Sequence, residues 1–186
     1  MRALRDIDFL NGEETRRQLL RWSYVLLAIA AAVGVVLGLA GAFDLAGEWA
    51  RLGGPFLWLV VASLLTLAAL PVHELVHAAL FLLFGGRGTR VRFGYQSGML
   101  YAGCPGLVLA RGKFCVVLAG PAVVLSAVLL AVPAALGLPL VGCVAFCLHL
   151  SGCAGDLLAI ALALREPACT HIEDTDTGVR LLGPGA

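Results

Sequence analysis

Two histidines four residues apart, with a glutamate directly after the first, form the chemically most informative pattern in the sequence. His73, Glu74 and His77 stand in the segment His-Glu-Leu-Val-His. Residues four apart share one face of a helix, so both imidazoles can bind one metal ion. Glu74 is then placed to take a proton from a water on that ion. Zinc suits two neutral imidazoles and a carboxylate, and it lowers the pKa of a bound water to about 7. The pattern predicts a Zn2+ site with Glu74 as the catalytic base of a hydrolysis.

The third metal ligand has to come from another part of the chain, and Asp156 is the candidate. Glu74 and Asp156 are the only acidic residues within the long apolar segments of the sequence. An ionisable group at the centre of a bilayer costs about 2.5–3.5 kcal/mol, and coordination of a metal would offset that cost. The alternatives are hydrogen bonds between helices for the two histidines, and a helix-packing hydrogen bond for Asp156 near Gly152 and Gly155.

The composition indicates that these residues are surrounded by lipid. Of 186 residues, 60% are hydrophobic and only 13% are charged, and the mean hydropathy is +0.94. Soluble domains are about half apolar and about a quarter charged. The net charge is +1, and no basic patch is interleaved with aromatic residues, so a nucleic-acid partner is not expected.

Four apolar runs are each long enough to cross a bilayer, which takes about 20 apolar residues. They predict an all-α integral membrane protein made of a single domain with four transmembrane helices. The expected spans are 22–43, 55–84, 114–136 and 140–164, flanked by a polar N-terminal segment, 1–21, and a polar C-terminal tail, 165–186. Between the second and third spans, Val91, Phe93 and Tyr95 alternate with polar or small residues before a turn at 96–98, which predicts a short β-hairpin-like loop.

The basic residues predict the orientation of the chain in the membrane. Five lie in the N-terminal segment, five in the 85–113 loop and two in the tail, whereas the link after the first span has one, Arg51. By the positive-inside rule, both termini and the long loop face the cytoplasm.

The orientation allows the depth of each candidate ligand to be compared. His73 and His77 are counted from Phe84, and Asp156 from Leu164, the expected cytoplasmic ends of their spans. At 1.5 Å per residue they lie roughly 16, 10 and 12 Å deep. The three ligands therefore fall in one layer of the membrane.

Further polar residues of the fourth span are candidates for contact with a substrate. His149 lies seven residues before Asp156 on nearly the same face, about 10 Å further along the helix axis, where it could contact a substrate or a developing oxyanion. A core histidine bonded to a backbone carbonyl is the alternative. Ser151 is a weaker candidate of the same kind. The acidic residues Glu173, Asp174 and Asp176 are expected to form a solvated face of the tail, with a metal site as the alternative.

Several segments together resemble a known family. PVHELVHAALFLLFG, LAGPAVVLS and SGCAGDLLAIALAL, within residues 60–182, resemble the putative zincin peptidase family of small bacterial membrane proteins. That family is similar in layout to the site-2 proteases, which are intramembrane zinc metallopeptidases. The resemblance implies an enzyme of the bacterial cell membrane, with zinc on His73, His77 and Asp156, Glu74 as base, and a membrane-protein or peptide substrate.

The resemblance is incomplete at the residues that would contact a substrate. Gly120-Pro121 is similar to the Gly-Pro pair that site-2 proteases carry in the helix after their loop. Site-2 proteases have asparagines after that pair and before the metal-binding aspartate, whereas this chain has Ser126, His149 and Ser151 in those stretches. The groups that would bind an oxyanion or a substrate are therefore expected to differ.

Two other functions use the same buried ligands. One is a non-catalytic zinc-binding membrane protein, a pseudoenzyme, and the other is a small metal-handling transporter. Four spans with one polar layer and no inverted repeat argue against a transporter. A Glu74→Gln variant separates the peptidase from the pseudoenzyme, because only the peptidase needs the base.

Overall fold

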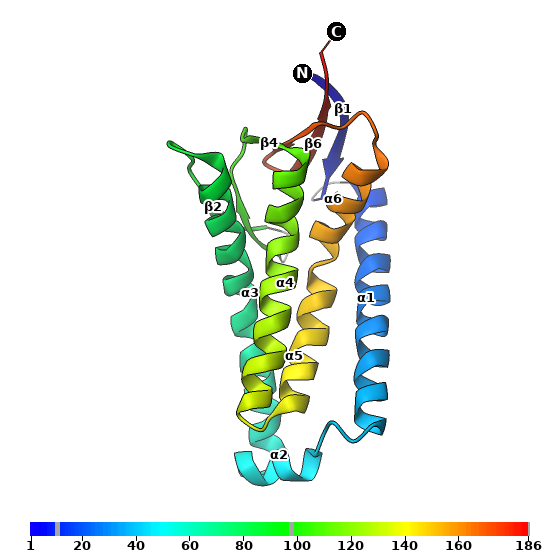
Figure 1. Ribbon diagram of the computed structural model, residues 1–186, viewed down its shortest axis with the longest axis vertical. Helices are drawn as coiled ribbons and strands as arrows, with labels where there is room; N and C mark the ends of the chain where they lie inside the picture. Colours follow the sequence, from blue (N-terminus) through cyan, green and yellow to red (C-terminus); the bar gives the residue numbers. More distant parts are fainter. Residues whose placement is uncertain (10–11, 97–98, 186) are drawn as a thin grey trace.

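The computed structural model describes residues 1–9, 12–96 and 99–185. Long helices lie side by side along the long axis of the molecule, and the short helix α2 closes one end (Figure 1). The two termini and the β-strands gather at the opposite end. The chain is therefore mostly helical with small antiparallel sheets, so the expectation of an all-α protein is corrected.

The helix boundaries follow turn residues of the sequence. Gly53, with φ 82°, ends α2, and the prolines Pro55 and Pro139 open α3 and α5, where a missing N–H costs nothing. The helices are α1 (Glu13–Leu39), α2 (Leu45–Leu52), α3 (Pro55–Gly85), α4 (Arg111–Ala135), α5 (Pro139–Gly152) and α6 (Ala154–Arg165).

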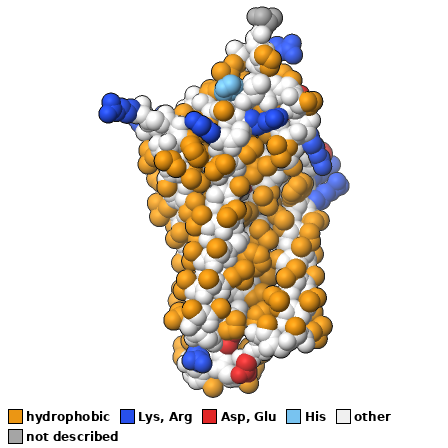
Figure 2. Space-filling model, in the orientation of Figure 1, with side chains coloured by type: hydrophobic (Ala, Val, Ile, Leu, Met, Phe, Trp, Pro, Cys, Tyr) orange, Lys and Arg blue, Asp and Glu red, His pale blue; other side chains and the backbone are white. Residues whose placement is uncertain are grey.

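Three helices, α1, α3 and α4, are long and apolar enough to cross a membrane. The pair α5 and α6 passes the same test together, although it bends by 48° at the break between them. The described residues thus include three helices that could span a membrane, or four if the bent pair is counted as one span. Figure 2 shows hydrophobic side chains over the body of the molecule and charged side chains at its two ends, a distribution compatible with an integral membrane protein.

The ends of the chain form a sheet that the sequence analysis did not predict. Strands β1 (Arg2–Asp8), β6 (Gly178–Gly183), β5 (His171–Asp174) and β4 (Val108–Ala110) form a four-stranded antiparallel sheet in that order. Ile172 and Leu181 are buried in a core cluster with Phe81 and Phe114. Asp174 of β5 is buried as well, so the expectation that this residue is solvated is wrong.

A second, two-stranded sheet lies between α3 and α4. Strand β2 (Arg92–Gln96) pairs antiparallel with β3 (Met99–Gly103), from Arg92 opposite Gly103 to Gln96 opposite Met99. The expected turn at 96–98 includes residues 97–98, which lie outside the described part of the chain. β3 runs along α3, which brings it beside the histidines of that helix.

Helix α1 packs against α5 and α6. A Cβ added at Gly34 would lie 3.0 Å from the Sγ atom of Cys143 on α5, so glycine permits the close approach of the two helices. The packing leaves a cavity between α1 and α3 that continues to the sheets.

Candidate metal centre

The two histidines of α3 lie one turn apart on the face that meets α4, α5 and α6. Their ring centroids are 4.7 Å apart, and both side chains are largely buried, with 13% of His73 and 7% of His77 exposed. The sequence expectation that both imidazoles share a face is confirmed by this geometry.

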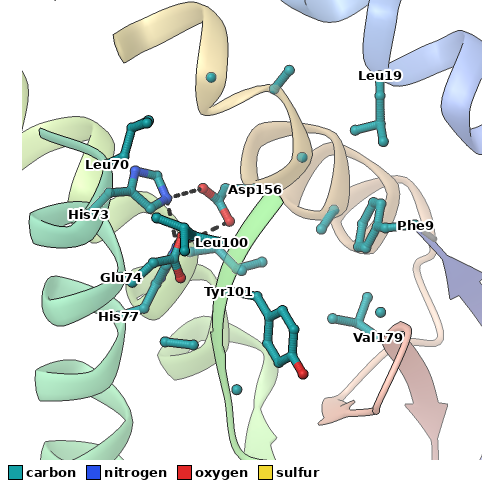
Figure 3. Close-up of a pocket in the computed structure, with 18 of the residues that line it drawn as sticks. Phe9, Leu19, Leu70, His73, Glu74, His77, Leu100, Tyr101, Asp156 and Val179 are labelled. Carbon is teal, nitrogen blue, oxygen red and sulfur yellow. Dashed lines mark hydrogen bonds and ion pairs between the residues drawn. The ribbon is translucent and has the colours of Figure 1, made fainter. Parts of the chain in front are cut away.

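Asp156 reaches the same point because the chain bends immediately before it. α5 ends at Gly152, Cys153 caps it, and α6 begins at Ala154, so Asp156 lies in the first turn of α6. The positive end of a helix dipole favours a carboxylate at that position. Figure 3 shows Asp156 pointing toward His73 and His77.

The distances between the three candidate ligands fit a tetrahedral zinc site. The Nε2 atoms of His73 and His77 are 3.0 Å apart, and they lie 3.2 and 3.3 Å from the two carboxylate oxygens of Asp156. With metal–ligand bonds of about 2.0–2.1 Å, neighbouring ligand atoms of a tetrahedron are about 3.3–3.4 Å apart. Two nitrogens and a carboxylate are also a donor set that zinc prefers, so the residues present fit the ion.

The second ring nitrogen of each histidine also has a partner. His77 Nδ1 donates to the backbone oxygen of Val117 on α4, at 3.0 Å. His73 Nδ1 lies 3.2 Å from Nε2 of His149, which is itself buried. Partners of this kind fix the tautomer and the orientation of metal-binding imidazoles, so both Nε2 atoms are aimed at the site.

The two residues proposed for substrate contact lie at different positions relative to the centre. His149 sits behind His73, on the far side of the ring from Asp156. Ser151 lies near the bend and donates its hydroxyl to the backbone oxygen of Leu148, at 2.8 Å. Both line the cavity described below. Contact of either residue with a substrate stays a prediction.

A second group of possible ligands shares His73. The Sγ atom of Cys153 is 3.9 Å from His73 Nδ1 and 3.8 Å from His149 Nε2. This group lacks a carboxylate. The group of His73, His77 and Asp156 is therefore the better candidate for a hydrolytic centre.

Glu74 lies between the candidate ligands and β3. Its carboxylate is close enough to both imidazoles and to Asp156 for electrostatic interaction, and the backbone amide of Ala102 faces it. Figure 3 shows Glu74 on the cavity side of α3, next to the ring of His73. A carboxylate in this position can exchange a proton with a molecule held at the centre.

A cavity of about 790 Å³ extends from the centre toward α1 and the sheets. Its apolar wall includes Leu19 and Leu20 of α1 and Leu70 of α3, and its other end is lined by Leu100 of β3 and Val179 of β6. Pockets of roughly 300–1,000 Å³ are typical of ligand sites. The volume is therefore sufficient for a short peptide segment.

Three charged residues line the sheet end of this cavity, a position that the sequence analysis did not predict: Arg92, Asp174 and Asp176. Arg92 on β2 lies 3.9 Å from Asp176, atom to atom, across the end of the cavity. Asp174 on β5 accepts a hydrogen bond from the backbone amide of Cys104, and burial raises the pKa of its carboxyl to about 6. Nothing in the tail's composition signals that Asp174 is buried, because its partners come from another segment.

Comparison with known protein families gives a match over the segment that contains the centre. The profile of one family, described as "Putative zincin peptidase", matches residues 66–171, more than half of the chain. No curated protein and no solved structure matches. The matched segment contains His73, Glu74, His77 and Asp156, the residues that the fold brings together. The description implies zinc binding and a metallopeptidase. The chain therefore belongs to the putative zincin peptidase family.

Proposed function

We propose that the protein is an intramembrane zinc metallopeptidase that hydrolyses a peptide bond of a membrane-associated substrate. One observation carries the proposal: two imidazole Nε2 atoms and a carboxylate lie 3.0–3.3 Å from one another, among helices long and apolar enough to cross a membrane, with a second carboxylate beside them. Ionisable groups are costly in lipid, and a shared cation with a catalytic role accounts for all four.

His73, His77 and Asp156 would hold the zinc ion. When bound, zinc supplies Lewis acidity, which acidifies a water molecule and polarises a carbonyl. Glu74 would accept a proton from the attacking water as the water oxygen bonds to the carbonyl carbon, and would pass that proton to the amine nitrogen as the C–N bond breaks.

The hairpin provides a means of holding the substrate extended. β3 pairs with β2 on one side, and among the described residues no further strand pairs with the hairpin. Leu100 and Tyr101 of β3 line the cavity. A peptide that adds to this sheet would be unwound beside Glu74. Unwinding is needed because the peptide bonds of a helix are shielded from attack.

The same proposal places the protein in the bacterial cell membrane with both termini in the cytoplasm. The pairing of β1 with β6 holds the two ends of the chain at one end of the molecule. The excess of basic residues in the segments at that end supports a cytoplasmic location. Substrates would reach the cavity laterally, between α1 and α3.

The test is cleavage by the purified protein in liposomes. The probes are fluorogenic peptides that contain one apolar segment of about 20 residues interrupted by a glycine pair. We expect cleavage that a chelator abolishes and zinc restores. A Glu74→Gln variant should keep about one zinc per chain but cleave about 10²–10⁴-fold more slowly, because a general base contributes that factor.

Controls separate this function from its alternatives. Glu14→Gln, an exposed change on α1, should leave cleavage intact. His73→Ala and Asp156→Ala should lose zinc as well as activity, and full metal content in both would show that the ligand set is wrong. Zinc binding with equal cleavage, or none, in wild type and Glu74→Gln would favour a pseudoenzyme. Zinc flux into the liposomes would favour a transporter.

A further inference from the structure

One backbone carbonyl of α4 has lost its partner within the helix. The carbonyl of residue i in an α-helix accepts a hydrogen bond from the N–H of residue i+4. For Val117 that residue is Pro121, which has no N–H and whose ring pushes against the carbonyl four residues before it. α4 nevertheless continues unbroken from Arg111 to Ala135, so the oxygen of Val117 is available to a donor outside the helix.

The donor that meets this oxygen is the candidate ligand His77. Its Nδ1 atom is 3.0 Å from the oxygen of Val117, and both groups are buried. A carbonyl cannot donate, so the proton of this bond sits on Nδ1. The lone pair of a neutral His77 is then on Nε2, the atom that faces His73 at 3.0 Å and Asp156 at 3.3 Å.

The glycine before this proline lets the two helices come close enough for the bond. A Cβ added at Gly120 would overlap with Cδ1 of Leu80 and would lie 3.5 Å from Cγ1 of Val76. Both of those residues are on α3, on either side of His77. Glycine thus permits the approach, and the proline beside it leaves the carbonyl free.

A second proline in α4 shows that a freed carbonyl alone does not make such a contact. Pro133 removes the donor for the oxygen of Leu129 in the same way. That oxygen faces Gly142 of α5 in close contact, where a Cβ could not fit, and meets no imidazole. Pro121 and Pro133 are both buried within α4, so a substitution of Pro133 is a matched control for the same substitution of Pro121.

We infer that Pro121 is a positioning residue of the metal centre. By leaving the carbonyl of Val117 without a helical donor, it reserves that oxygen for His77 Nδ1 and holds the imidazole with its Nε2 lone pair toward the cation. This role is part of the proposed function, but it requires only that the centre binds zinc. It therefore holds whether or not the chain cleaves peptides.

The experiment compares Pro121→Ala with Pro133→Ala. Alanine at 121 supplies an N–H that competes with His77 for the Val117 oxygen. The zinc dissociation constant, measured by competition with a chromophoric chelator, should rise about 10–100-fold in Pro121→Ala. It should stay within about threefold of wild type in Pro133→Ala, which makes the same chemical change away from the centre. Alanine favours a helix over proline, so we expect the Tm of the metal-free Pro121→Ala variant not to fall.

A spectroscopic measurement separates positioning from general packing. In metal-free protein labelled with 15N at histidine, His77 of the wild type should carry its proton on Nδ1, whereas Pro121→Ala should show an added population protonated on Nε2. Wild-type zinc affinity in Pro121→Ala, or an equal loss in Pro133→Ala, would overturn the inference. An unchanged tautomer in Pro121→Ala would overturn it as well.

Discussion

Each of the two histidines of α3 has a partner at both of its ring nitrogens. Among the described residues, no buried side-chain nitrogen or oxygen lacks a hydrogen-bond partner. His73 and His77 direct Nε2 toward Asp156, while their Nδ1 atoms meet His149 and the Val117 backbone. An unpaired polar group is costly in a low-dielectric environment. The hydrogen bonds of the two Nδ1 atoms therefore make it possible to bury both imidazoles beside Asp156.

His149 is expected to support zinc binding through His73. When Nε2 of His73 binds a cation, its Nδ1 carries a proton that needs an acceptor, and Nε2 of His149 is 3.2 Å away. His149→Leu removes the acceptor, so the zinc affinity should fall about 10–100-fold. His149→Gln keeps an acceptor near the same position and should retain most of the affinity. Competition with a chromophoric chelator measures both.

A control and a second readout make the His149 prediction specific. Phe146→Leu changes the packing of the same helix without touching His73, and its zinc affinity should match the wild type. Equal affinities in His149→Leu and His149→Gln would contradict the prediction. In cobalt-loaded protein, a thiolate charge-transfer band that disappears in Cys153→Ser would show that His149 and Cys153 bind a cation themselves.

At the scale of elements, α5 is fixed at both ends. Its C-terminal end bends at Cys153 and so delivers Asp156 to the centre. Its N-terminal end is held by Glu48 of α2, whose carboxylate accepts from the backbone amides of Leu140 and Val141, at 2.6 and 3.2 Å, and from Trp58 Nε1 at 2.7 Å. Only 2% of Glu48 is exposed, so this link acts as a buried cap between three helices.

Replacement of Glu48 is therefore expected to destabilise the whole bundle. Glu48→Ala leaves three donors without their acceptor, at a cost of about 1–3 kcal/mol for each donor that water does not reach. Thermal unfolding in detergent should show a clearly lower Tm. Glu13→Ala removes an exposed charge that lies 3.7 Å from Arg17 and should change the Tm little, since such pairs are worth about 0–1 kcal/mol. Similar Tm values for both variants would contradict the role of Glu48.

At the scale of the molecule, the sheet joins both chain ends to the loop beside the cavity. Asp174 of β5 makes three bonds with this loop: its carboxylate accepts from the amide of Cys104, its backbone oxygen from Gly106, and its amide donates to Leu107. The C-terminal strands therefore hold the end of β3, the strand next to Glu74. A substitution in the tail can therefore change the position of β3 beside the candidate site.

The buried carboxyl of Asp174 predicts a pH-dependent stability. Burial raises its pKa to about 6, above the unfolded value of about 4. The folded chain therefore binds more protons, so the group stabilises the fold below about pH 4, and this contribution is lost as the pH rises through about 6. Asp174→Asn keeps an acceptor for Cys104 but does not titrate.

The measurement is the difference in Tm between the wild type and Asp174→Asn, with a chelator present in both samples. It is followed between about pH 4.5 and 7.5. The difference should fall by a few degrees as the pH rises. Other titrating groups are common to both proteins and cancel in the difference. A difference that is constant with pH, or that rises, would contradict the assignment to Asp174.

The sequence predicted the parts that depend on local pattern. Apolar runs longer than a bilayer, helical spacing and the cost of charge in lipid were enough to find the long helices and to group His73, Glu74, His77 and Asp156. These signals were sufficient because each depends only on the period of a helix or on the composition of a short stretch of sequence. The fourth apolar run predicts one continuous helix, because its apolar character does not show the break at Cys153.

Only the tertiary structure decided what depends on contacts between distant segments. The burial of Asp174, the cap that Glu48 gives to α5, and the partners of the two Nδ1 atoms each join residues far apart in the chain. The terminal sheet is of the same kind, because strands pair through backbone groups that every residue carries, and the sequence does not say which partner they meet. Residue types and spacing determined which chemistry was available, and packing decided which atoms are free to perform it.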